Sequence, residues 1–457
     1  MPEYLTVSLD RKPWNTIEES VHSFMYTLTS LLGFTLGYLY CQKMPPNRRF
    51  LVEGLLVILP NVLNSTVNVK FNDWFCVVSI VLILYRVWRT RFWQELDNRT
   101  FDVGKRPVVF TLLRSNAYIG VCAAILAVDF PLFPHACRKS RYFGASVMDL
   151  GIGVFVWNMG LVSHRARNLR DLGRLPKVVA PLLVLGLGRT LIISLINYNQ
   201  DEHEYGTHLN AFFMLGFTKL FGSLCTLAVR SDWQLLPLSL GILFLQELGL
   251  QMGLSNFVMS ESAGRENLLT ANREGLSALP GCIGLYIFSI YFAKWYTSKQ
   301  TLSYVEMRRK LCQMLIMSIS SWCLVFVSAH VLGIARVTFS AGYNIWVFAT
   351  CASLLLIYML LYELALKPSN QEAQQQLIGD AEAPTKTQQI QLPMFVEALN
   401  MNGLLHFMLS NLLTGFVNMT LKPDERNRFE SVLIMTIYML SSSCVSFVLY
   451  RRGIRIA

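Results

Sequence analysis

The sequence predicts an all-α polytopic membrane protein, and three observations lead to that fold class. Of the 457 residues, 53% are hydrophobic and only 15% are charged. The mean hydropathy is +0.40. Apolar runs long enough to cross a bilayer as helices recur along the whole chain. A soluble protein of this length would need far more charge on its surface.

Thirteen apolar runs of spanning length follow one another, separated by polar loops. They fall at 21–41, 50–68, 73–88, 108–129, 144–163, 178–197, 209–229, 233–252, 279–296, 311–333, 343–366, 400–420 and 429–450. We therefore expect one integral-membrane domain over residues 1–457. Within it, the Gln-rich segment 367–392 has little apolar content and is predicted to be a disordered cytosolic loop.

The distribution of basic residues predicts the orientation of the chain. The net charge is +11, and of the 40 Lys and Arg residues 25 fall in one set of alternate loops and 12 in the other. The richer side is expected to be cytosolic, which places the N-terminus in a lumen and the C-terminus in the cytosol. Because the cations lie in short loops and form no basic groove, nucleic acid is not an expected partner.

The ten cysteines and seven histidines show no metal-binding spacing. The cysteines occur singly, without a CxxC pair, and are interpreted as small buried residues. No HExxH, P-loop or GxSxG motif occurs either. The sequence therefore predicts no metal centre and gives no support to a covalent Ser or Cys mechanism.

The fifth apolar run carries an acid and begins directly after a basic loop. Three basic residues precede it: Arg138, Lys139 and Arg141. If the helix begins at Gly144, Asp149 lies about 7.5 Å further along, below the lipid headgroups. A carboxylate there costs about 3 kcal/mol on insertion scales, so a span that carries one commonly uses it. A general base is one use, and a hydrogen bond to a neighbouring span is the other.

A second polar cluster, at 197–210, lies on the same predicted side of the membrane as Asp149. It contains Asp201, His203, Glu204, His208 and Asn210. Histidines next to carboxylates can form an acid–base network at a membrane surface. A metal site would need a standard ligand spacing, which is absent. A solvated acidic loop followed by a helix cap is the other interpretation.

Two further groups of charges have both a structural and a functional interpretation. Arg273 and Glu274 stand at the start of a span, where Arg either anchors the helix at the interface or binds a phosphate with two parallel bonds. Arg165 and Arg167 follow the Asp149 span on the predicted cytosolic side. They fit ordinary positive-inside anchoring, or a surface for a polyphosphate such as coenzyme A.

Charged residues inside the spans favour a different class of function. They are Arg114, Arg189, Lys219 and Glu247. Intramembrane charges of this kind occur in transporters, and a lipid or solute transporter without chemistry is the main alternative. A scaffold subunit of a larger membrane complex is a third possibility. Asp149 is the nearest candidate by type to pair with an isolated cation such as Lys219, and Glu247 is another candidate.

Three segments together carry a resemblance to a known family. They read RKSRYFGASVMDLGIG at 138–153, EHEYGTHLNAFF at 202–213 and ANREGLSALPG at 271–281. In this order they resemble the inositol acyltransferase family of glycosylphosphatidylinositol (GPI) anchor biosynthesis, whose fungal members are called GPI-anchored wall transfer proteins. The resemblance covers nearly the whole chain. It implies a thirteen-span protein of the endoplasmic reticulum membrane with its functional motifs toward the lumen.

The resemblance also implies an activity and its substrates. The family moves a fatty acyl chain, usually palmitoyl, from acyl-CoA to the inositol 2-hydroxyl of glucosaminyl-phosphatidylinositol. Acyl-CoA is then a co-substrate, no bound cofactor is expected, and protein partners are unknown. Asp149, in the family's DLG motif, is the expected catalytic residue, and the basic residues at 138–141 match the approach to it.

These residues permit a mechanism that needs no metal. Asp149, alone or relayed through His203 or His208, would deprotonate the inositol hydroxyl. Glu204 and Asn210 match positions of the family's second motif and are expected near the substrate. Arg273, with Glu274 beside it, would bind the lipid phosphate together with the 138–141 cluster. Acyl-CoA would reach the protein from the cytosol at Arg165 and Arg167.

Overall fold

The computed structural model describes residues 12–66, 69–90, 96, 100–104, 106–195, 202–366 and 392–456. The chain divides into two compact units. The first comprises 1–21, 139–298 and 319–350, and the second 22–138, 299–318 and 351–457. The loop predicted at 367–392 lies outside the described residues, apart from Leu392, and so does Asp201.

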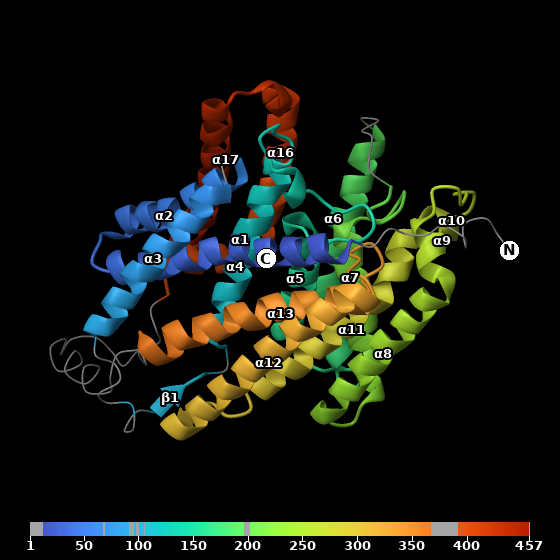
Figure 1. Cartoon of the computed structure of the whole chain (residues 1–457), viewed down its shortest axis with the longest axis horizontal. Coiled ribbons are helices and arrows are strands. Elements are labelled where there is room, and N and C mark those ends of the chain that lie inside the picture. The colour runs from blue at the N-terminus through green and yellow to red at the C-terminus, as the bar shows by residue number, and fades with distance from the viewer. Residues whose placement is uncertain are drawn as a thin grey trace. The chain divides into compact units, whose positions relative to one another are not determined.

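The described part of the chain is almost entirely helical (Figure 1). Its two strands, β1 (Thr100–Asp102) and β2 (Thr301–Ser303), form one short antiparallel ladder in the second unit. Phe101 stands opposite Leu302 in that ladder, and both side chains are buried. The fold class predicted from the sequence, all-α, is confirmed.

The first unit is built around helix α11 (Arg273–Tyr296), which packs against α5, α7 and α8. Figure 1 shows α8 and α11 running side by side. The helices of this unit are α5 (Val147–Leu161), α6 (Leu175–Leu195), α7 (Ala211–Cys225), α8 (Leu235–Gly249), α9 (Ser255–Met259), α10 (Leu268–Ala271) and α11. A π-helical turn, Leu250–Leu254, joins α8 to α9, and α6 packs on α7. Short 3₁₀ turns occupy Asp171–Arg174, Thr226–Ala228 and Asp232–Gln234.

In the second unit, α17 packs against α2, α15 and α16, and α4 packs against α2, α15 and α16. The helices are α2 (Pro46–Thr66), α3 (Val69–Arg89), α4 (Val108–Ala127), α15 (Met394–Met401), α16 (Gly403–Leu421) and α17 (Arg428–Arg451), with 3₁₀ turns at His135–Cys137 and Pro423–Glu425. Three helices pass from one unit to the other: α1 (Pro13–Tyr40), α12 (Tyr304–Val331) and α13 (Ala341–Tyr358), which ends in the π-helical turn Met359–Ala365.

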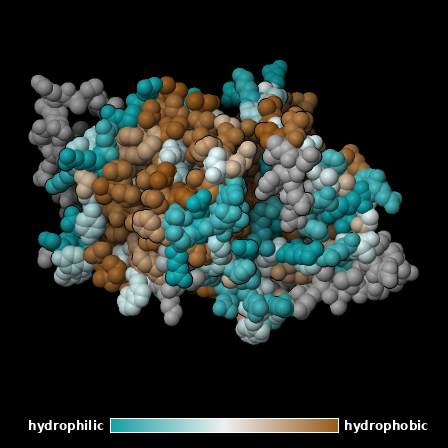
Figure 2. All heavy atoms as spheres, turned by 90° about the horizontal axis from the view of Figure 1, so that it is seen from above, coloured by the Kyte–Doolittle hydropathy of each residue, from teal (hydrophilic) through white to brown (hydrophobic). Residues whose placement is uncertain are grey.

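Nine helical segments in the described residues are long and apolar enough to cross a membrane. They begin at Val108, Asp171, Ala211, Asp232, Arg273, Tyr304, Ala341, Gly403 and Arg428. Large apolar side chains stay exposed on them, as at Leu187 on α6 and Phe244 on α8. Figure 2 shows hydrophobic residues over much of the face it draws. Such surfaces suit lipid, so the chain is a polytopic membrane protein.

Each of the thirteen predicted runs coincides with a helix, but the count of spans and the orientation stay predictions. Four of those helices, α1, α2, α3 and α5, do not meet the length and composition of a membrane span. Helix α5 has only 15 residues.

Candidate functional site

Helix α5 begins later than the apolar run suggests, and this changes the setting of Asp149. The sequence predicted a helix from Gly144, whereas Ser146 is extended and α5 starts at Val147. Asp149 is therefore the third residue of the helix and not a group about 7.5 Å along it. The backbone N–H of Asp149 donates to the Ser146 hydroxyl, and the Ser146 N–H donates to the Asp149 carboxylate. These two bonds form a capping box, which explains where the helix starts.

The basic loop before α5 folds back onto the same carboxylate. Ser140 donates its N–H to both carboxylate oxygens of Asp149, at 3.1 and 3.2 Å. Its hydroxyl donates to Oδ2 of Asp149 at 2.6 Å. Gly144 lies against this serine, because a Cβ built at Gly144 would stand 2.0 Å from Ser140 Oγ. The loop is also bonded to α1, since Ala145 N–H donates to Glu19 at 2.9 Å.

The cation that pairs with Asp149 is Arg336, from the loop between α12 and α13. Its Nε donates to Oδ1 of Asp149 at 3.0 Å, and the two side chains are 4% and 0% exposed. Tyr343 on α13 donates its hydroxyl to the Asp149 carbonyl oxygen at 2.7 Å. The sequence suggested Asp149 as a partner for Lys219, but Lys219 instead donates to the hydroxyls of Ser163 and Tyr286.

A cavity of about 240 Å³ opens beside this pair. Its lining residues are Lys139, Ser140, Arg141, His203 and Arg336. Asp149 does not line it, but two of its bonding partners, Ser140 and Arg336, do. The Asp149 carboxylate therefore does not reach the cavity directly but is bonded to two side chains that line it. Among the described residues, three cations and no carboxylate line the cavity, which makes it a setting for an anion.

The turn that starts α7 supplies the other predicted acid–base residues. Glu204 forms an ion pair with Lys139, and His203 lines the cavity. Burial alone would raise the pKa of Glu204, but Lys139 and Arg336 outweigh it and hold that pKa below 4.5. The ionised Glu204 carboxylate therefore makes it electrostatically favourable to hold the positively charged Lys139 in the cavity wall.

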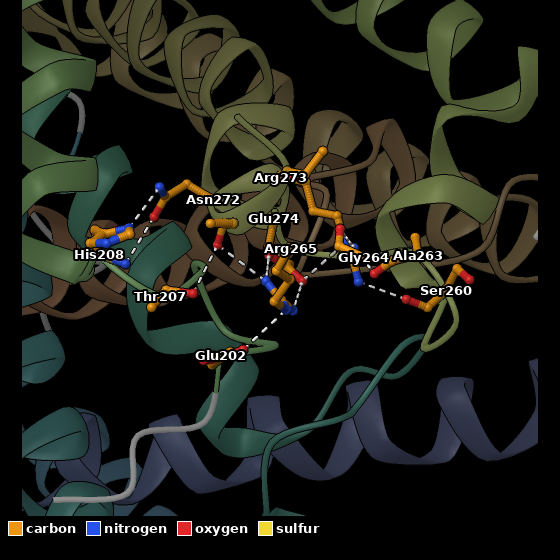
Figure 3. A network of polar contacts seen from close by, with 12 residues as sticks. Glu202, Thr207, His208, Ser260, Ala263, Gly264, Arg265, Asn272, Arg273 and Glu274 are labelled. Atoms are coloured by element: carbon orange, nitrogen blue, oxygen red, sulfur yellow. Dashed lines mark hydrogen bonds and ion pairs between the residues drawn. The ribbon is translucent and has the colours of Figure 1, made fainter. Parts of the chain in front are cut away.

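His208 and Asn210 are engaged in the architecture of the turn. The Nδ1 atom of His208 lies 3.1 Å from the side-chain amide of Asn272, and its backbone N–H donates to the same side chain at 2.9 Å (Figure 3). Asn210 caps α7, because its side-chain oxygen accepts from the N–H groups of Phe212 and Phe213. Neither residue lines the cavity.

The third cluster folds into a separate ion-pair network. Arg265 binds both carboxylate oxygens of Glu274, at 2.5 and 3.1 Å, and also contacts Glu202 at 3.0 Å (Figure 3). Arg273, 4% exposed, donates to four backbone carbonyl oxygens, those of Val258, Ser260, Ala263 and Gly264. The predicted phosphate-binding Arg273 thus holds its own loop together, and Glu274 holds Arg265.

The two arginines of the predicted cytosolic patch, Arg165 and Arg167, differ in burial. Arg165 is largely buried, donating to Asp232 at 2.9 Å and to the Val229 carbonyl at 2.6 Å. The side chain of Arg167 is exposed.

In the basic loop before α5, Arg141 is also exposed and pairs with Glu261 at 2.7 Å. Arg138 belongs to the second unit and has a buried Nε without a partner in the described residues.

Sequence reasoning missed two residues of this site, Ser140 and Arg336. Ser140 lies among three basic residues, and the prediction for this loop was based on their charge alone. Arg336 is the lone cation of 334–342, a loop between two long apolar runs, and that isolation was the available signal. The loop has an unusual backbone, because Phe339 has a φ of 47° in the left-handed region.

Segments far apart in the sequence meet at this site. Thr207 N–H donates to the Ala271 carbonyl at 2.9 Å, and Gly275 N–H donates to the Tyr205 carbonyl at 3.2 Å. The Lys139–Glu204 pair joins the first segment to the second. Residues 139–153, 202–213 and 271–281 are therefore held together by direct contacts, which the resemblance alone could not show.

The GWT1 family matches residues 15–449 of the chain. The chain belongs to the GWT1 family. GPI-anchored wall transfer protein 1 of Candida albicans is 28% identical over 96% of both chains. The protein of the same name in Schizosaccharomyces pombe is 30% identical, over 79% of this chain and 75% of its own length. Human glucosaminyl-phosphatidylinositol-acyltransferase PIGW is 27% identical, over 88% of this chain and 87% of its own.

Membership of the GWT1 family confirms the resemblance carried by the three segments. All three lie inside the matched residues. The names of the relatives describe GPI-anchored wall transfer and glucosaminyl-phosphatidylinositol acylation. The site of this GWT1-family chain is thus the place to look for acyl-transfer chemistry.

Proposed function

We propose that this protein is an acyltransferase of GPI-anchor biosynthesis in the endoplasmic reticulum membrane. It moves a fatty acyl chain, palmitoyl being the expected one, from acyl-CoA to the inositol 2-hydroxyl of glucosaminyl-phosphatidylinositol. Family membership supports this class of reaction. The observation that carries the proposal to particular residues is the bond from Ser140, which lines the basic cavity, to the buried carboxylate of Asp149.

Asp149 is the proton acceptor in this mechanism and acts through Ser140. The inositol hydroxyl gives its proton to Ser140 Oγ while the Ser140 hydroxyl proton moves to Asp149 Oδ2, along the 2.6 Å bond between them. The inositol oxygen forms a bond to the thioester carbonyl carbon, and the carbon–sulfur bond breaks. Asp149 then returns its proton through Ser140, and the CoA thiolate is protonated.

His203 is the other base within reach of the substrate, because it lines the cavity. His208 takes a supporting role and fixes the turn through Asn272. Lys139 and Arg141 bind the phosphate of the glycolipid, with Glu204 orienting Lys139. Acyl-CoA contacts the exposed Arg167 from the cytosol, and Arg165 stabilises that loop through Asp232.

The proposal is tested by assaying acyl transfer with purified protein, labelled acyl-CoA and glucosaminyl-phosphatidylinositol. Only an enzyme gives an acylated product, so the assay also separates this function from a transporter or a scaffold. Asp149→Asn is expected to lower kcat by about 10²–10⁴-fold, the usual contribution of a general base. Near wild-type turnover in that variant would eliminate Asp149 as the proton acceptor.

A further inference from the structure

Arg336 is a buried cation whose surroundings account for only part of its hydrogen-bonding capacity. A guanidinium has five N–H donors in a fixed fork. The Nε donor goes to Asp149, and the guanidinium carbon lies 5.7 Å from the centre of the Tyr205 ring. The Nη1 atom is buried and has no hydrogen-bond partner among the described residues.

A hydrogen-bond donor without a partner on a buried arginine is energetically unfavourable. The side chain is 4% exposed, so bulk water does not replace the missing partner freely. A buried donor left without a partner destabilises the folded protein, and a charged donor does so more than a neutral one. Such a group usually marks a place where a ligand or an ordered water completes the bonding. Arg336 also lines the cavity, so a ligand there is within reach of its guanidinium.

The rest of the cavity wall selects the chemistry of the missing partner. Lys139 and Arg141 add two more cations, and Ser140 and His203 add groups that can donate. The acids that balance Lys139 and Arg141, Glu204 and Glu261, do not line the cavity. Its volume of about 240 Å³ greatly exceeds the ~10–15 Å³ that one water needs.

We propose that this cavity binds a phosphate group, with the guanidinium of Arg336 as its buried donor group and Lys139 and Arg141 flanking it. Arg336 then acts as a positioning residue that contacts two groups at once. Its Nε orients Asp149, and its remaining N–H donors bind the phosphate oxygen. The inference rests on the proposed function only for the source of the phosphate, which that function takes to be the glycolipid phosphodiester; coenzyme A is the other source, and the test below distinguishes the two.

Binding is measured on the purified full-length protein in detergent, without any turnover, so a failure of the proposed reaction does not affect the result. The probes are glycerophosphoinositol, which is a phosphodiester, coenzyme A, and uncharged myo-inositol. Isothermal titration gives the Kd of each. Binding of glycerophosphoinositol or of coenzyme A, but not of myo-inositol, is expected. The probe that binds identifies the source of the phosphate.

Two variants test whether Arg336 is the donor. Arg336→Gln with Asp149→Asn removes both charges of the buried pair and so leaves no uncompensated charge; it is expected to weaken binding about ten- to a hundredfold. Asp149→Asn alone keeps Arg336 and removes the carboxylate that competes for it, so the Kd is expected to stay equal or fall. Thermal unfolding confirms that both variants are folded.

Lys299→Gln is the matched control, because Lys299 pairs with Glu306 as Lys139 does with Glu204 but lies outside the cavity. It is expected to leave the Kd unchanged. Two results overturn the proposal. One is that neither phosphate probe binds, and the other is that the folded double variant binds as tightly as the wild type.

Discussion

Arg336 and Arg273 are two buried arginines of the same unit, each next to a carboxylate, and they differ in what their donors contact. Each is 4% exposed. Arg273 has its donors on four backbone carbonyl oxygens of the 258–264 loop. Arg336 contacts one carboxylate and one aromatic ring, lines the cavity, and has an Nη1 atom with no hydrogen-bond partner among the described residues.

The difference separates a structural arginine from one available to a ligand. Residue type, burial and a neighbouring acid are the same in both, so none of these features separates them. What distinguishes them is the number of carbonyl groups that the local backbone turns toward each side chain. The loop at 258–264 wraps around Arg273, whereas the loop at 332–340 bonds largely to itself, as Ala335 N–H does to Ser340.

The largest effect is expected at Arg273. Arg273→Gln removes the donor of four backbone carbonyl groups, three of them in buried bonds, and breaking such a buried charged network costs about 3–5 kcal/mol. We expect a sharp fall in thermal stability and poor recovery of folded protein. A stable but inactive Arg273→Gln protein would contradict the structural role and return Arg273 to the substrate site.

The next effect compares two serines on the same carboxylate. Ser140 and Ser146 both donate a hydroxyl to Oδ2 of Asp149, at 2.6 and 2.9 Å, but only Ser140 lines the cavity. Ser140→Ala is expected to lower kcat about a hundredfold with little change in KM. Ser146→Ala removes a helix cap and is expected to cost about 1 kcal/mol of stability. Equal kcat values in the two variants would remove Ser140 from the proton path.

A smaller effect is expected at the cavity wall. Lys139→Gln removes one of three cations and is expected to raise the KM for the glycolipid about tenfold, the lower range for a charged hydrogen bond. Steady-state kinetics at saturating acyl-CoA measure it. Lys299→Gln serves again as the control, and an equal KM in the two variants would contradict phosphate binding by Lys139.

The cytosolic face provides a test for acyl-CoA. Arg167 is exposed and Arg165 is bonded to Asp232, so charge reversal at Arg167 changes the patch with the least structural cost. Arg167→Glu is expected to raise the KM for acyl-CoA several-fold more than it lowers kcat, since it acts on encounter with a polyphosphate. An unchanged KM at low ionic strength would count against this route.

The smallest effect is a pH dependence carried by Glu204. Its pKa in the folded protein lies below 4.5 because Lys139 and Arg336 favour the ionised form. The stabilisation is therefore complete above pH 4.5 and is lost as the pH falls through the lower, folded-state value. Thermal unfolding of Glu204→Gln in detergent, measured as a function of pH, is expected not to show this loss of stability at acid pH. Parallel curves of stability against pH for the wild type and the variant would contradict this prediction.

The sequence was sufficient for the class of fold and singled out three of the residues that line the cavity, Lys139, Arg141 and His203, since hydrophobicity and charge can be read position by position. The start of α5 was wrong by three residues, because Gly144, Ala145 and Ser146 fit an apolar run while Ser146 caps the helix. The partner of Asp149 was missed because Arg336 comes from a loop 187 residues away. Contacts of that separation depend on packing, which no local pattern records.

Gly206 has a consequence for how the cavity could change shape. Its φ of 98° suits glycine, and a Cβ there would stand 2.5 Å from the Cα of Asn272. The turn that carries His203 is thus pressed backbone to backbone against the segment that leads into α11. Separation of the two segments would break the backbone bonds from Thr207 to Ala271 and from Gly275 to Tyr205. A side chain larger than hydrogen at position 206 would therefore force apart a junction that fixes the turn bearing His203.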